Sequence, residues 1–161
     1  MSQSSPGTTT APREAEARRA VGRRVGYAVA VACNVALLVI LNNLLEWGWF
    51  PWLTEDLGRA LPYLNASLIA SAAANAVYLF YDAQPFKGFA ELGLLVVSLL
   101  ATIRLLQVFP FDFSAYDFAW GTLVRWILGV GIFGVCVAMV VQLTLLARLA
   151  ARAAGERPPQ S

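Results

Sequence analysis

Four apolar stretches of about twenty residues constrain this chain more than any other feature of its sequence. They cover residues 25–45, 61–81, 88–108 and 118–147, and few charged residues interrupt them. About twenty apolar residues are needed for a helix to cross the hydrocarbon core of a bilayer. Because backbone groups in lipid must pair within their own segment, each stretch is expected to be an α-helix. The sequence therefore predicts an all-α integral membrane protein, a bundle of four transmembrane helices.

The composition agrees with this fold class and argues against several functions. Of the 161 residues, 58% are hydrophobic, 14% are charged and none is histidine, whereas about a quarter of the residues in soluble domains are charged. The absence of histidine excludes metal sites and haem sites with histidine ligands, and it excludes acid–base catalysis by histidine. Cys33 and Cys136 form no C-x-x-C pair and are expected to be buried as small hydrophobic residues. We expect no enzyme activity, no cofactor, no metal and, with a net charge of +2, no nucleic-acid partner.

The basic residues predict the direction in which the helices run. Lysine and arginine favour the cytoplasmic side of a membrane. They lie before the first stretch, between the second and third stretches and after the fourth. In the other two connections Arg59 is the only basic residue, and it is accompanied by several acidic residues. Both termini are therefore expected on the cytoplasmic side. The richness in Arg, Ala and Gly suggests a bacterial plasma (inner) membrane.

Three segments are expected along the chain. Residues 1–24 read as a flexible basic N-terminal tail, residues 25–150 as the transmembrane domain and residues 151–161 as a flexible C-terminal tail. The outermost parts of both tails are poor in apolar residues and rich in residues typical of disorder, so they bury too little apolar surface to order themselves.

The two connections expected on the outer face are rich in aromatic residues. The first contains Trp-Gly-Trp-Phe-Pro-Trp over 47–52, and the second contains Phe-Pro-Phe-Asp-Phe over 109–113. Aromatic residues concentrate at membrane interfaces, so a belt is the plain interpretation and a docking surface for a lipid or partner is the alternative. Both connections also follow a Leu-Leu-Glu or Leu-Leu-Gln run, which leaves duplication of a hairpin open. Ser114-x-x-Asp117 fits a capping box at the start of the fourth helix.

Charged residues near the outer ends of the stretches are the candidate functional residues. Arg125 lies about 10 Å into the fourth helix at 1.5 Å per residue. We predict an outer polar cluster in which the two arginines pair with a glutamate or a loop aspartate, acting as an ion-pair clamp or as an anion site. Its residues are Glu46, Arg104, Asp112, Asp117 and Arg125.

Polar residues also follow single faces of the helices. Such stripes are expected to hydrogen-bond across helices and specify packing, although they could also line a narrow polar path. The stripes contain Asn34 and Asn42 in the first helix, Ser67, Ser71, Asn75, Tyr78 and Asp82 in the second, and Glu91, Ser98 and Thr102 in the third.

Three functions are consistent with these patterns. The favoured one is a structural or accessory membrane subunit, or a self-associating helical bundle. The alternative is a small transporter or channel subunit that moves an ion or small solute, and the least favoured is a lipid- or quinone-linked membrane enzyme. The expected partners are the lipid bilayer, further copies of the chain or a larger membrane complex.

Overall fold

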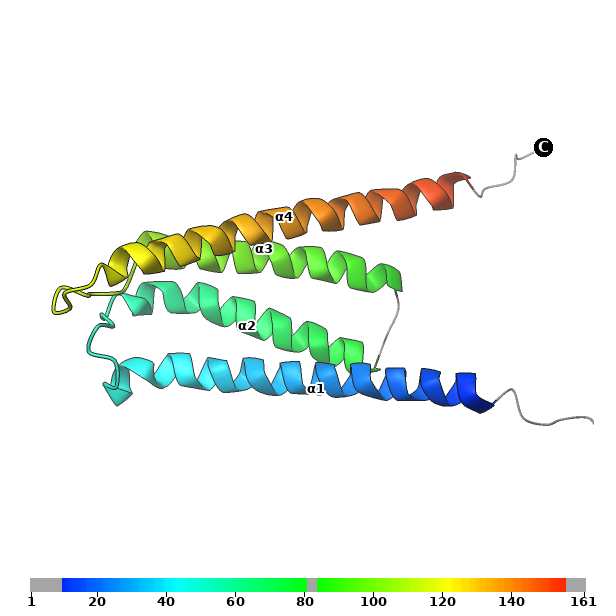
Figure 1. Ribbon diagram of the computed structural model, residues 1–161, viewed down its shortest axis with the longest axis horizontal. Coiled ribbons are helices and arrows are strands. Elements are labelled where there is room, and N and C mark those ends of the chain that lie inside the picture. Colours follow the sequence, from blue (N-terminus) through cyan, green and yellow to red (C-terminus); the bar gives the residue numbers. More distant parts are fainter. Residues whose placement is uncertain (1–9, 81–83, 156–161) are drawn as a thin grey trace, which may run out of the picture.

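The computed structural model describes residues 10–80 and 84–155 of the chain, and these residues form four long α-helices (Figure 1). All four are long and apolar enough to cross a membrane, which confirms the predicted all-α class. The helices are α1 (Thr10–Trp47), α2 (Leu57–Phe80), α3 (Gln84–Val108) and α4 (Trp120–Gly155).

Two helices extend well into the predicted tails. α1 begins at Thr10, so residues 10–24, which the sequence assigns to a flexible tail, are helical instead. Ala, Arg and Glu dominate this segment and are strong helix formers, and Pro12 lies in the first turn, where a helix tolerates proline. α4 likewise continues to Gly155. The rest of the two predicted tails, residues 1–9 and 156–161, lies outside the described residues.

α2 begins earlier than the apolar pattern indicates. The backbone amide of Leu57 donates to the carbonyl of Thr54 over 3.1 Å, and the helix follows from Leu57. Pro62 therefore lies beyond the first turn of the helix. A proline at this position loses the hydrogen bond to the residue four places back, which here is Gly58, close to the helix start.

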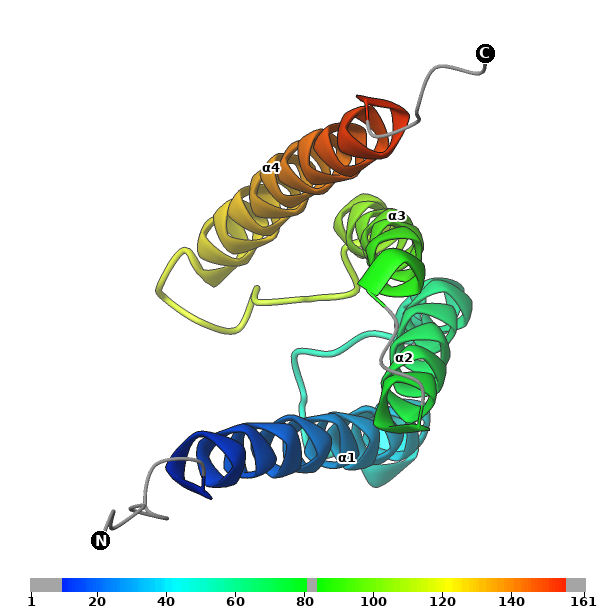
Figure 2. The ribbon, with the colours of Figure 1, turned by 90° about the vertical axis from the view of Figure 1, so that its right-hand side faces the viewer.

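The four helices form a curved row. α1 packs on α2, α2 on α3 and α3 on α4, and within the described ranges no other pair of helices is in contact. Seen along the helices, α1 and α4 stand at the two ends of an arc (Figure 2). The four predicted helices therefore form an open row rather than a closed ring, because closure would bring α1 against α4. Apolar side chains gain little by leaving lipid for protein, so no hydrophobic force closes the row.

Burial follows from this arrangement. The most deeply buried hydrophobic side chains belong to the two central helices: Leu57 and Ala60 are 3% and 0% exposed, and Ala101 on α3 is 3% exposed. Cys33 on α1 and Cys136 on α4 are both exposed, contrary to the expectation of burial, because the edge helices have few neighbours. The few buried side chains thus belong to the two central helices and to Pro110 in the second connection, and α1 and α4 present apolar side chains to the surroundings.

The molecule has two distinct ends. The connections 48–56 and 109–119 lie together at one end, and the start of α1 and the end of α4 lie at the other (Figure 1). We refer to the two connections as the cap, to their end as the cap end, and to the opposite end as the tail end. Gly48 ends α1 with φ of +61°, a left-handed conformation that glycine adopts without strain.

Candidate functional site

The two connections of the cap pair with each other through their backbones. The amide of Thr54 donates to the carbonyl of Pro110 over 3.0 Å, and the amide of Asp112 donates to the carbonyl of Trp52 over 2.8 Å. These bonds flank an antiparallel bridge between Leu53 and Phe111. Two hairpins that are far apart in the sequence are therefore joined at the cap end.

Aromatic rings fill the cap around this bridge. The Trp52 ring lies 5.8 Å from that of Phe111 and 5.7 Å from that of Phe113, centroid to centroid. Such distances are typical of stabilising aromatic pairs. A cavity of about 460 Å³ opens beside these rings. Its lining is almost wholly aromatic: Trp52, Phe111, Phe113, Tyr116, Trp120 and Val124.

Arg125 contacts the cap through an aromatic ring rather than a carboxylate. Its guanidinium carbon lies 4.3 Å from the centroid of the Phe109 ring. One turn earlier, a Cβ on Gly121 would lie 3.9 Å from ring atoms of both Phe109 and Phe113, which is ordinary van der Waals contact and shows that the cap packs on α4 at this point. Phe109 has a φ of +43°, an uncommon conformation for a residue other than glycine. The cation–π contact accompanies this strained turn.

Arg104 is likewise stacked. Its guanidinium carbon lies 5.5 Å from the Tyr63 ring on α2, and its Nη1 donates to Oε1 of Gln107 over 3.4 Å. The Nε atom is buried and has no hydrogen-bond partner among the described residues. Arg104 thus links α3 to α2, away from the Arg125 contact.

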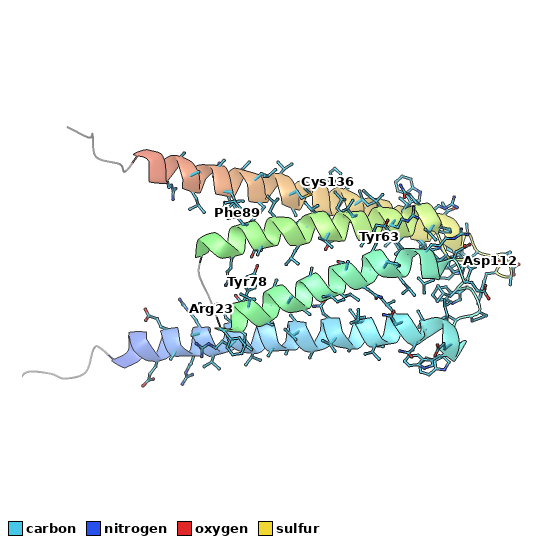
Figure 3. The ribbon with its side chains drawn as sticks, turned by 180° about the vertical axis from the view of Figure 1, so that it is seen from behind. Arg23, Tyr63, Tyr78, Phe89, Asp112 and Cys136 are labelled. Carbon is cyan, nitrogen blue, oxygen red and sulfur yellow. The ribbon has the colours of Figure 1, made fainter. Side chains whose placement is uncertain are left out.

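The three acidic residues predicted to pair with these arginines lie apart from them. Glu46 is exposed in the last turn of α1, and Asp112 and Asp117 are exposed in the cap; Figure 3 shows Asp112 at the cap end. The backbone amide of Ser114 donates to Asp112 over 2.9 Å, and this bond, with one to the Ser114 side chain, holds the pKa of the carboxyl below its ordinary value. The predicted capping box is also absent, because α4 begins at Trp120.

The predicted ion-pair cluster is therefore not formed. Within residues 10–80 and 84–155, no ion pair joins Arg104 or Arg125 to Glu46 or to a cap aspartate. The physical reason is that aromatic rings occupy the positions beside the arginines, Phe109 of the cap beside Arg125 and Tyr63 of α2 beside Arg104. A planar guanidinium stacks on an aromatic face, and the carboxylates stay in the exposed part of the cap. The Arg125 contact joins the cap to α4, and the Arg104 contact joins α3 to α2.

A cluster at the tail end was not predicted. Nζ of Lys87 on α3 donates to the hydroxyl of Tyr27 on α1 over 2.6 Å. The same nitrogen lies 4.9 Å from the Tyr27 ring centroid and 5.3 Å from that of Tyr78 on α2. Tyr78 is shown near this end in Figure 3. The sequence indicates only that these three residues lie at a similar depth in the membrane. Their contact depends on which helices are neighbours, which the sequence does not give.

Several residues of the polar stripes hydrogen-bond across helices, as predicted. Asn42 on α1 and Asn65 on α2 exchange two hydrogen bonds of 2.9 Å. Ser67 on α2 and Ser98 on α3 have their hydroxyl oxygens 3.3 Å apart. Asn75, by contrast, donates to the backbone of its own helix, at Ser71, over 2.8 Å. Asp82, the last residue of the second stripe, lies outside the described residues.

Comparison of the chain with known protein families, with curated proteins and with solved structures gives no match. Any functional argument therefore depends on the residues of this chain and their arrangement.

Proposed function

We propose that this protein is an accessory subunit of a bacterial inner-membrane assembly and that α4 packs against a transmembrane helix of another polypeptide. The observation that carries the proposal is a group of three glycines near the middle of α4, namely Gly129, Gly131 and Gly134. Apart from the adjacent residues and backbone of α4 itself, no atom of the described residues lies within 4 Å of the position that a Cβ would take at any of them.

Small residues are what membrane helices use to approach one another closely. α4 is an edge helix that contacts only α3 in the described part of the chain, so these glycines do not serve contacts within the protein. Each glycine in a helix interior costs about 1 kcal/mol relative to alanine. Three glycines that make no contact with the other helices of this chain are what we expect in a helix that packs against a helix of another polypeptide. Large apolar side chains flank the glycines, with Val130 and Phe133 being 64% and 70% exposed.

In the proposed orientation the tail end faces the cytoplasm and the cap faces outward. Between Trp120 and Arg148, α4 rises about 42 Å at 1.5 Å per residue. Between Arg18 and Trp47, α1 rises about 44 Å. Both lengths match a bilayer including its headgroup regions, about 40–45 Å. This spacing supports aromatic residues in one interface and arginines in the other, the side that positive charge favours.

The transporter alternative has less support. The polar residues on which it depends pair with each other between adjacent helices, as Asn42 does with Asn65 and Ser67 with Ser98. Such pairs fit the packing role that the sequence analysis left open.

The proposal is tested by native mass spectrometry of the protein extracted from its own membrane in a mild detergent. We expect a mass well above the 17.4 kDa of one chain, and we expect Gly131→Leu with Gly134→Leu to return it to a single chain. The matched control is Gly93→Leu on α3, which also meets nothing within 4 Å and should leave the assembly intact.

These substitutions improve helix propensity, and the Cβ that each adds meets no described atom outside its own helix within 4 Å, so the helices should be retained. A photo-crosslinking residue at Val130 should capture a second polypeptide or a second copy of this one. A wild-type protein that is monomeric on extraction and yields no crosslinked polypeptide from Val130 would refute the proposal. So would an assembly that survives the double glycine substitution.

A further inference from the structure

A crevice lies between α3 and α4 at the tail end, far from the aromatic cavity of the cap. It holds a cavity of about 380 Å³. One wall is the first turns of α3, with Lys87, Gly88 and Glu91, and the other is the last part of α4. The Nε2 atom of Gln142 donates to the carbonyl of Gly88 over 3.1 Å and holds the two helices together at this point. The α4 residues of the lining are Gln142, Leu145, Leu146, Arg148, Leu149 and Arg152.

The charges around the cavity favour an anion. Three cationic side chains line it against one carboxylate, that of Glu91. Lys87 donates to Tyr27 on α1, so the two exposed arginines of α4, Arg148 and Arg152, are the main groups available to a ligand. Arginine binds phosphate oxygens in a bidentate manner.

The cavity is also apolar, which distinguishes it from a site for a water-soluble anion. Leu145, Leu146 and Leu149 form much of its α4 wall. A second cavity of about 480 Å³ adjoins it through two shared residues, Glu91 and Gln142, and continues between α3 and α4 toward Ser98 and Ala138. From Arg152 to Ala138 the crevice extends about 21 Å along the helix. A ligand that fits both parts has an anionic head and a long apolar chain.

The depth of the arginines agrees with such a ligand. Arg148 lies about 42 Å along α4 from Trp120, which is about the thickness of a bilayer including both headgroup regions. Basic pockets between transmembrane helices at a membrane surface bind the headgroups of acidic lipids. We infer that this crevice binds one acidic phospholipid, with its phosphate on Arg148 and Arg152 and an acyl chain between α3 and α4. The site is separate from the α4 glycines, so it does not depend on the proposed partner helix.

The test is a lipid titration of the purified full-length protein in detergent, followed by native mass spectrometry. The probes are phosphatidylglycerol, phosphatidylcholine and water-soluble glycerol 1-phosphate, each measured as the fraction of protein that carries one ligand. We expect phosphatidylglycerol to bind tightest. The variant Arg148→Gln with Arg152→Gln should weaken its binding about thirty-fold, because each basic residue near the bilayer surface contributes about fivefold to the attraction of anionic lipid.

Two controls separate this site from general charge and from misfolding. Arg18→Gln with Arg19→Gln removes the same charge from exposed residues of α1 at the same end of the molecule, and should leave binding within about threefold because neither residue lines the cavity. Arg148→Lys with Arg152→Lys keeps both charges and should retain most of the binding.

Three results would overturn the inference. The first is an equal loss of binding in the α1 control, and the second is phosphatidylcholine that binds as tightly as phosphatidylglycerol. The third is glycerol 1-phosphate that displaces the lipid at equal concentration, which would assign the crevice to a free phosphate compound.

Discussion

The tail-end cluster provides a matched pair of substitutions whose effects should differ in sign. Tyr27 and Tyr78 both place their rings beside the ammonium of Lys87, at 4.9 and 5.3 Å. Only the Tyr27 hydroxyl accepts a hydrogen bond from it, at 2.6 Å. The Tyr78 hydroxyl is buried and has no hydrogen-bond partner among the described residues. Tyr27→Phe and Tyr78→Phe therefore remove the same atom from two different situations.

The expected magnitudes follow from this difference. A hydrogen bond to a charged group contributes about 1.5–3 kcal/mol in soluble proteins, and hydrogen bonds between membrane helices contribute up to about 1.7 kcal/mol. Tyr27→Phe should therefore cost about 1.5 kcal/mol of unfolding free energy, because it removes the acceptor of the Lys87 hydrogen bond. Tyr78→Phe removes a buried polar group without a partner, which is costly to hold. It should be neutral, or should stabilise the fold by about 1 kcal/mol.

The measurement is reversible unfolding in mixed micelles, with helicity followed by circular dichroism as the denaturing detergent increases. Lys87→Met provides the internal control, because Tyr27→Phe should cost less than about 0.5 kcal/mol once the donor is removed. Equal losses for Tyr27→Phe and Tyr78→Phe would refute the reasoning. An undiminished cost of Tyr27→Phe in the Lys87→Met background would do the same.

Three further predictions concern the cap and the α1–α2 interface. Leucine substitutions at Asn42 and Asn65 should each destabilise the protein in the same unfolding assay, and the double substitution should cost about 1 kcal/mol less than their sum, because the side chains bond to each other; additive costs would contradict the pairing. Arg125→Gln and Phe109→Leu should likewise be coupled by about 0.5–2 kcal/mol through the cation–π contact, whereas zero coupling would dismiss it. The lowered pKa of Asp112 predicts stabilisation that is present above the unfolded-state pKa of about 3.9 and is lost as the pH falls through the lower folded-state pKa. Asp112→Asn should abolish this part of the acid dependence of the thermal midpoint, and an unchanged pH profile would count against it.

The helices could be predicted from sequence because hydropathy is a property of each segment alone. All four predicted stretches lie almost entirely within the observed helices, and the largest error, at residues 10–24, arose because a charged helix carries no apolar signal. The row of helices could not be predicted in the same way. In lipid the choice of neighbour depends on close packing and a few polar contacts, such as that between Asn42 and Asn65. Those contacts are visible only once the helices have been placed.

The candidate site shows a second limit of sequence reasoning. The sequence singles out the two arginines as candidates and predicts carboxylates as their partners. Arg104 and Arg125 instead stack on Tyr63 and Phe109. The aromatic residues had been assigned collectively to a membrane belt, and only the pairing of the two connections brings a particular ring to a particular guanidinium. The basic crevice between α3 and α4 needed the same information, since its cations come from segments far apart in the chain.

The absence of an α1–α4 contact bears on whether the two helical hairpins are related by duplication. Around the bridge between Leu53 and Phe111, the two hydrogen bonds are arranged as a local two-fold axis requires. If that symmetry extended through the helices, α1 would correspond to α3 and α2 to α4. The α2–α3 contact would then require an equivalent contact between α4 and α1. Within the described ranges that contact is absent, so the symmetry stops at the cap. A helix of another polypeptide beside the α4 glycines would give α4 the second neighbour that α1 does not provide.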